Sequence, residues 1–297
     1  MLKRIPKGAR IAAANKLNHL IEACIIKNDF NSWQDLVCYS YYALQVPKKC
    51  STSLCRLVKK NVENFKIDQP LPKTTLKTTS NLSKRIEAKV ADGDIRGAIR
   101  LLASTDDIAP QDADTLEKLR SKHPSPSRLL QFPDPPAANS EKLVVTEKEV
   151  FKSIHSFGSG SAAGIDGLRP QHLMDLVSKI TGDAGVKLLS SCTNLCNFML
   201  SGKVCDEIVE FFYGATLCAL TKKDGGLRPI AVGNTFRRLV AKLGCLSIKD
   251  QIANLFSPIQ MGFGIKGGCE SIVHAVRTFL NFNETDLTNI FRFQKRI

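Results

Sequence analysis

Apolar side chains recur at intervals of three and four residues along most of the chain. Over residues 10–65 this spacing predicts a helical region. Thr146-Glu-Lys-Glu149 has the pattern of a capping box and predicts a helix start. Further helical patterns cover residues 184–200, 204–213, 235–256 and 270–280. In the third of these we expect one long helix that buries Leu239, Val240, Leu243, Leu246, Ile248 and Ile252.

The clearest β signal is the stretch 217–232, which has the pattern of two short strands joined by a tight turn. Asp224-Gly225 and Gly225-Gly226 can supply the positive φ that a hairpin turn demands. Together with the helical segments, this hairpin predicts an α+β fold that is predominantly helical.

Two segments rich in proline interrupt the pattern and suggest domain boundaries. Residues 66–80 read as a linker, and residues 123–140 hold five prolines and mark the main boundary. The organisation we expect is a helical region over 1–65, a linker over 66–80, short helices over 81–122, a proline-rich linker over 123–144, a second folded region over 145–283 and a divergent tail over 284–297.

The net charge of +14 points to a polyanionic partner such as DNA or RNA, although charge also serves general solubility. No apolar run is long enough to span a bilayer, so we expect no membrane association. The ten cysteines lack the dense spacing of a secreted disulfide scaffold, which favours a reduced, intracellular protein of the cytoplasm or nucleus. Cys192 and Cys196 lie one helical turn apart, and we interpret them as core residues.

Three cations gather at the tip of the expected hairpin. Lys222 and Lys223 end the first strand and Arg228 begins the second, so all three can reach a polyphosphate or a nucleic-acid backbone. The alternative is a solvated hairpin whose charges only keep the chain soluble.

The glycine-rich segment 158–170 lies between two expected helices. A dinucleotide-binding loop would need a strand before it, and a Walker loop would need a Gly-Lys-Ser/Thr ending. We interpret the segment as an ordered turn, in which Asp166-Gly167 reverses the chain and Arg169-Pro170 starts the next helix. Gly164 belongs to the same turn.

These motifs follow one another in a familiar order. Ala163-Gly-Ile-Asp-Gly-Leu168, Leu220-Thr-Lys-Lys-Asp-Gly-Gly-Leu-Arg-Pro-Ile230, Asn234 and Gln260-Met-Gly-Phe263 together resemble the fingers of the reverse transcriptases of non-LTR retrotransposons. The resemblance covers residues 145–283. It implies an incomplete right-hand polymerase, with the fingers and the start of the palm, preceded by a helical region.

The resemblance also implies roles for single residues. Arg228 and a lysine at 222 or 223 would contact the phosphates of the incoming dNTP, while Pro229 fixes φ beside the arginine. Gly225 and Gly226 would form the turn. Gln260, Gly262 and Phe263 would lie near the template and the nucleotide pocket, with a turn at Gly262 and packing by Phe263 as the alternatives. The implied partners are an RNA template, a DNA primer and a dNTP.

The family's palm carboxylates, which hold two Mg²⁺ ions, have no counterpart in this sequence. We therefore assign no catalytic residue and no metal ligand, and expect the chain to be an inactive fragment by itself. One choice of codons for residues 292–297 reads Asp-Phe-Lys-Asn-Ala in a shifted frame, which predicts a frameshift in the coding DNA. The alternatives are a non-catalytic basic nucleic-acid-binding module and a helical protein-interaction domain.

Overall fold

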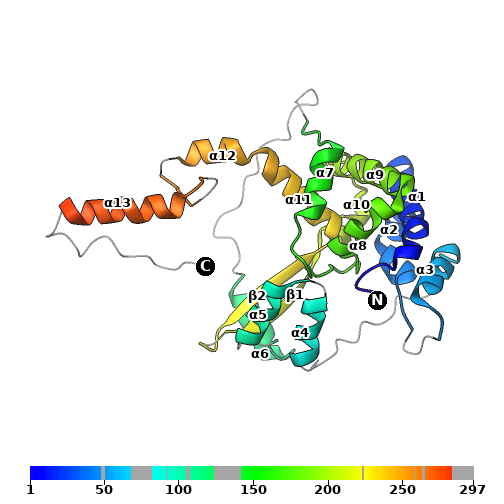
Figure 1. The fold of residues 1–297 in the computed structure, drawn as a ribbon, viewed down its shortest axis with the longest axis horizontal. Helices are drawn as coiled ribbons and strands as arrows, with labels where there is room; N and C mark the ends of the chain where they lie inside the picture. The colour runs from blue at the N-terminus through cyan, green and yellow to red at the C-terminus, as the bar shows by residue number, and fades with distance from the viewer. Residues whose placement is uncertain are drawn as a thin grey trace. The chain divides into compact units, whose positions relative to one another are not determined.

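The computed structural model describes residues 1–47, 51–67, 82–91, 93–104, 108–123, 142–222, 224–257, 259–262 and 265–282 (Figure 1). Helices dominate these residues, and a single two-stranded antiparallel sheet accompanies them. This confirms the expectation of a predominantly helical chain with a small β-hairpin. The tail 284–297, the linker 66–80 except its first two residues, and most of 123–144 lie outside the described residues.

The chain divides into two compact units, Met1–Leu243 and Gly244–Ile297. The first unit contains α1 (Arg10–Lys27), α2 (Phe30–Ala43), α3 (Leu54–Glu63), α4 (Leu82–Ala91), α5 (Ile95–Ala103), α6 (Ala113–Ser121), α7 (Glu147–His155), α8 (Pro170–Leu176), α9 (Asp183–Leu200), α10 (Asp206–Tyr213), β1 (Ala215–Thr221), β2 (Leu227–Gly233) and most of α11 (Thr235–Ser247). Short 3₁₀ turns, η1 (Lys7–Ala9) and η2 (Lys179–Thr181), precede α1 and α9.

Local sequence accounts for where several helices begin. The Thr146 hydroxyl accepts from the Glu149 backbone N–H, and the Glu149 carboxylate accepts from the Thr146 N–H, so the expected capping box is formed. Pro170 occupies the first turn of α8, where its missing N–H costs nothing, as expected. Asp29 caps α2 by accepting from the Ser32 N–H, directly after the left-handed Asn28 that ends α1.

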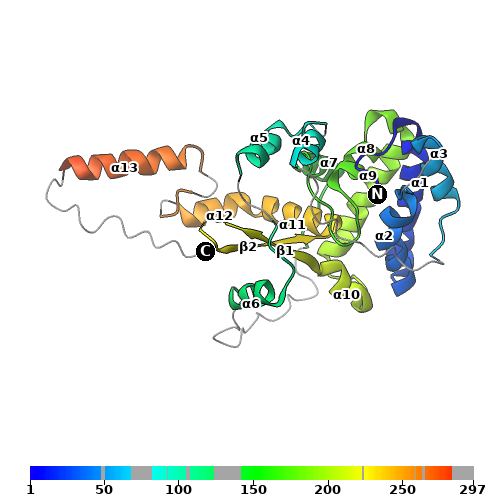
Figure 2. The ribbon, with the colours of Figure 1, turned by 90° about the horizontal axis from the view of Figure 1, so that it is seen from below.

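The N-terminal helices and the helices after residue 145 share one core. Helix α1 packs against both α8 and α9, and α2 and α3 pack against α1 (Figures 1 and 2). The apolar stripe of α1 (Ala13, Leu17, Ile21) is fully buried, as is that of α9 (Leu188, Cys192, Leu195). The structure divides after Leu243, whereas the sequence pattern placed the main boundary at 123–140. An apolar stripe on a helix must be covered by another element, and the stripes of α1 and α9 cover each other.

Trp33 of α2 is a core residue. It is fully buried, and its ring meets that of Phe212 edge to face at a centroid distance of 5.3 Å. Cys192 and Cys196 are also fully buried, and burial raises the pKa of the Cys196 thiol to about 12. Their core role is confirmed.

The stretch 235–256 is helical as predicted, but the expectation of one continuous helix is wrong. Helix α11 ends at Ser247, and α12 (Lys249–Phe256) follows in the second unit. Leu239 and Leu243 are buried as expected, but Leu246 and Ile248 are 54% and 47% exposed. Ile248, with φ −100° and ψ 0°, separates the two helices.

The second unit also contains α13 (Gly268–Phe282). None of the helices in the described part of the chain is long and apolar enough to cross a membrane.

Candidate phosphate-binding hairpin

The expected hairpin turn is closed by two backbone hydrogen bonds. The Lys222 N–H donates to the Gly226 carbonyl at 2.8 Å, and the Gly225 N–H donates to the Lys222 carbonyl at 3.1 Å. Among the described residues of the tip, only Gly225 has a positive φ, at 76°. Gly226 is instead held by its N–H, which donates to the Asp224 carboxylate at 3.0 Å. Three residues thus separate the closing pair, and one glycine carries the left-handed conformation.

The cations at the tip share one face of the hairpin. Arg228 pairs with Leu220, and Lys222 lies two residues beyond Leu220, so strand alternation places both cations on the same side. Both are exposed. Lys223 and its side chain lie outside the described residues.

The opposite face of the hairpin is covered. Ala219 and Leu227 are each 6% exposed and form a small cluster with Ala109 and with Leu119 of α6. The Ala109 N–H also donates to the Ala219 carbonyl at 3.0 Å. Ile108 and Leu220 form an isolated antiparallel bridge beside β1. Helix α6 therefore supports the tip from one side.

The glycine-rich loop, residues 158–169, supports the root of the hairpin. The Gly167 N–H donates to the Gly164 carbonyl at 3.1 Å, and Gly167 has φ 70°, which confirms the expected chain reversal. The Thr235 hydroxyl donates to the Leu168 carbonyl at 2.5 Å. Buried Asn234 accepts from the Phe236 N–H at 2.8 Å and starts α11.

Two cations of α11 hold the end of α7 and the first part of the same loop. The Arg238 guanidinium donates to the Ala162 carbonyl at 2.8 Å, and the Lys242 ammonium donates to the Ser156 hydroxyl at 2.8 Å. Both cations lie over the ring of Phe157, at 5.2 Å and 4.5 Å from its centroid. Sequence reasoning missed this arrangement; an aromatic residue at the end of α7 was the available signal.

Asp166 is buried inside the loop. Its side chain is enclosed, and its Oδ1 atom has no hydrogen-bond partner among the described residues. Burial raises the pKa of this carboxyl to about 7, although a bond from the Leu168 N–H and the positive charge of Arg238 pull the pKa down. The turn residue of the sequence motif is thus also a carboxyl that titrates near neutrality.

The segment with Gln260 belongs to the second unit, and the structure describes it by itself. The Gln260 N–H donates to the Phe256 carbonyl at 2.8 Å, and the Gln260 side chain accepts from the Gly262 N–H at 3.0 Å. This local geometry favours the alternative of a simple turn at Gly262. Phe263 lies outside the described residues.

No set of three or more His, Cys, Asp or Glu side chains in the described ranges could hold a metal ion. Among the described residues of the hairpin tip, Asp224 carries a carboxylate, and this carboxylate accepts a hydrogen bond from the Gly226 N–H. The described residues therefore do not fit the two Mg²⁺ ions that the resemblance implies.

Comparison with protein-family models, with curated proteins and with solved structures found no match.

Proposed function

We propose that residues 145–283 are the fingers of an RNA-directed DNA polymerase of the non-LTR retrotransposon type. In this proposal the hairpin contacts the phosphates of an incoming dNTP. The carrying observation is the hairpin itself: Lys222 and Arg228 share an exposed face, while α6 covers the other face. The order of the sequence motifs agrees with this proposal.

The two cations suit a polyphosphate in different ways. Arg228 offers a planar fork that can bind two phosphate oxygens at once, and Lys222 offers a compact point charge. Pro229 follows Arg228 directly, and its ring fixes the φ of residue 229, so the backbone next to Arg228 is restricted. An RNA template and a DNA primer are the proposed macromolecular partners, in keeping with the net charge of +14.

The proposal concerns binding and not turnover. Because the described residues offer no pair of carboxylates for Mg²⁺, we derive no chemical step and expect no primer extension by this chain alone. We place the protein in the cytoplasm or nucleus as part of the same proposal.

Binding of a deoxynucleoside triphosphate, measured by titration calorimetry, tests the proposal. We expect Arg228→Ala and Lys222→Ala each to weaken binding about tenfold, the loss of one charge-assisted contact. Lys187→Ala is the matched control, because Lys187 is an exposed cation on α9, far along the chain from the hairpin. Equal affinity of wild type and Arg228→Ala would contradict the proposal.

A non-catalytic nucleic-acid-binding module is the second candidate, and the same cationic face favours it. This candidate predicts RNA binding that weakens steeply as salt rises, without measurable affinity for a free triphosphate. Titrations with a single-stranded RNA and with the triphosphate, on the same variants, separate the two functions.

A further inference from the structure

We propose that Tyr41, on α2, is a positioning residue for the cationic hairpin. This inference rests on the proposed function of the hairpin. Tyr41 lies far from the hairpin in the sequence. It acts through the glycine-rich loop, and it need not touch a ligand.

The first step is a direct bond between α2 and the loop. The Tyr41 hydroxyl donates to the Ile165 carbonyl at 2.7 Å, across 124 residues of sequence. Ile165 follows Gly164 and precedes the buried Asp166, so the hydrogen bond holds the middle of the loop. Next to it, the side chain of Met1 fills the space above Gly167, where a Cβ would lie 2.3 Å from the Met1 methyl carbon.

The second step explains why α2 is a firm anchor. The Leu2 N–H donates to the carbonyl of Leu44, at the end of α2, at 2.9 Å. The Leu2 carbonyl in turn accepts from Nε2 of buried His172, on α8, at 3.0 Å. Burial lowers the pKa of His172 to about 4, so its ring is neutral and can donate through Nε2 while Nδ1 accepts from the Arg169 N–H.

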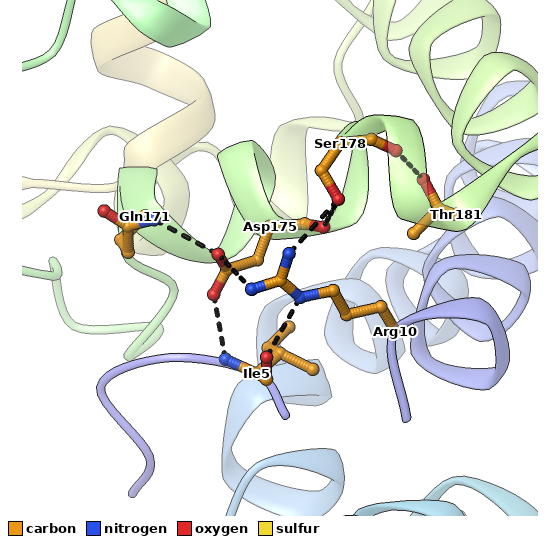
Figure 3. A network of polar contacts seen from close by, with 6 residues as sticks. All are labelled: Ile5, Arg10, Gln171, Asp175, Ser178 and Thr181. Atoms are coloured by element: carbon orange, nitrogen blue, oxygen red, sulfur yellow. Dashed lines mark hydrogen bonds and ion pairs between the residues drawn. The ribbon is translucent and has the colours of Figure 1, made fainter. Parts of the chain in front are cut away.

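A network of polar contacts then locks the N-terminal segment onto α8 (Figure 3). The Asp175 carboxylate accepts from the Ile5 N–H at 2.9 Å and from the Arg10 guanidinium at 2.8 Å. Arg10 also donates to the Ile5 carbonyl and to the Ser178 hydroxyl, and Gln171 donates to Asp175. Helix α2 and helix α8, which begins where the loop ends, are therefore held by the same short segment.

The third step leads from the loop to the hairpin. Gly164, beside Ile165, packs against the backbone of Gly233, the last residue of β2. Thr235 bonds Leu168 at the other end of the loop. A shift of the Ile165 carbonyl therefore reaches the end of β2 through one neighbouring residue, and with it the strand that carries Arg228.

Tyr41→Phe tests the inference, because it removes only the hydroxyl. Tyr39→Phe is the matched control: Tyr39 lies two residues away on the same helix, and its hydroxyl donates to the Ala13 carbonyl at 3.0 Å inside the core. Since Tyr39 is buried and Tyr41 is only half-buried, the control should lower the melting temperature at least as much. If Tyr41 had only a structural role, the loss of triphosphate affinity in each tyrosine variant would be proportional to its loss of stability.

We expect Tyr41→Phe to weaken binding of a deoxynucleoside triphosphate about fivefold, the equivalent of one neutral hydrogen bond, and Tyr39→Phe to leave it unchanged. Amide hydrogen exchange should accelerate over residues 162–168 and at the end of β2 in Tyr41→Phe only. Fluorescence of Trp33, the single tryptophan, should stay unchanged and report an intact core.

The outcomes separate this inference from the proposed function. If the wild type binds the triphosphate and Tyr41→Phe binds equally well with unchanged exchange in the loop, Tyr41 has no positioning role. If both tyrosine variants weaken binding in proportion to their loss of stability, the inference also fails. If the wild type binds no triphosphate, the proposed function is the part that fails, and the inference falls with it.

Discussion

Gly164 and Gly233 lie in direct backbone contact, although 69 positions separate them in the chain. A Cβ built on Gly164 would lie 2.6 Å from both the carbonyl carbon and the carbonyl oxygen of Gly233, and 2.7 Å from the Asn234 nitrogen. These neighbours are backbone atoms, which cannot rotate aside as a side chain can. The contact joins the glycine-rich loop to the end of β2 and leaves room for no other residue.

Gly164→Ala should therefore destabilise the first unit by about 1–3 kcal/mol, the usual cost of overpacking. The loop would have to move away from β2 to admit the methyl group. Urea unfolding followed by Trp33 fluorescence measures the change in the free energy of unfolding. Gly244→Ala is the control, because no atom lies within 4 Å of a Cβ at that helical position. An equal effect of the two substitutions would show that close packing is not the reason.

Gly225→Ala should destabilise the hairpin tip by about 1–2 kcal/mol, for a different reason. A Cβ at Gly225 meets no atom within 4 Å, but the residue has φ 76°, which an alanine adopts at a cost. Gly225→Asn should destabilise the hairpin tip less than Gly225→Ala, because asparagine tolerates the left-handed region. Hydrogen exchange of the Gly225 and Lys222 amides measures the change. Identical exchange in the alanine and asparagine variants would contradict the conformational explanation.

The sequence pattern predicted most of the helices because their amphipathic periods are local. It also predicted the hairpin, whose glycines and flanking strands occupy one short stretch. It did not predict that α1 packs on α9, because a period shows that a stripe is buried and not what buries it. For the same reason it did not place α6 under the hairpin, across the proline-rich segment.

For the candidate site, the positions of Lys222 and Arg228 on either side of the predicted turn were enough to expect both at one tip. The support of the tip depends on long-range contacts that no local pattern contains. The bond from Tyr41 to Ile165 spans 124 residues, and that from Arg238 to Ala162 spans 76. The raised pKa of Asp166 depends on the burial of its side chain. The motif Asp166-Gly167 predicts a turn but does not show that the carboxyl is buried.

The second unit should be the part of the chain that unfolds first. Helix α12 contains no buried residue, and α13 buries only Gly268. Large apolar side chains of both helices are exposed, among them Leu255 at 73% and Phe282 at 83%. Because little apolar surface is removed from water, the helices gain little stability from packing.

Limited trypsin digestion with mass spectrometry measures this difference. Cleavage should occur first at Lys249 and Arg277 in the second unit. Arg237 and Arg238 are the internal control, because they lie in α11 and bond to Tyr213 and Ala162, so cleavage there should be slow. A single cooperative thermal transition of the whole chain, or equally fast cleavage at both pairs of sites, would refute the prediction.

The pKa of Asp166 gives the first unit a dependence on pH. An aspartate has a pKa of about 4 in the unfolded chain, and burial raises the pKa of Asp166 to about 7 in the folded protein. Between these values the folded state keeps a proton that the unfolded state has lost, so rising pH favours unfolding. His172 acts in the opposite sense: its pKa is lowered to about 4, so stability rises with pH between that value and about 6.5.

Asp166→Asn separates the two effects, because the amide does not titrate and His172 is unchanged. The asparagine oxygen can still accept from the Leu168 N–H, so the turn should persist. The free energy of unfolding of the variant, minus that of the wild type, should grow from pH 4 to pH 7 by a few kcal/mol and then level off. Urea unfolding at steps of one pH unit measures this difference. A difference that is constant from pH 4 to pH 8 would mean that Asp166 is ionised in the folded protein throughout, with Arg238 compensating its buried charge.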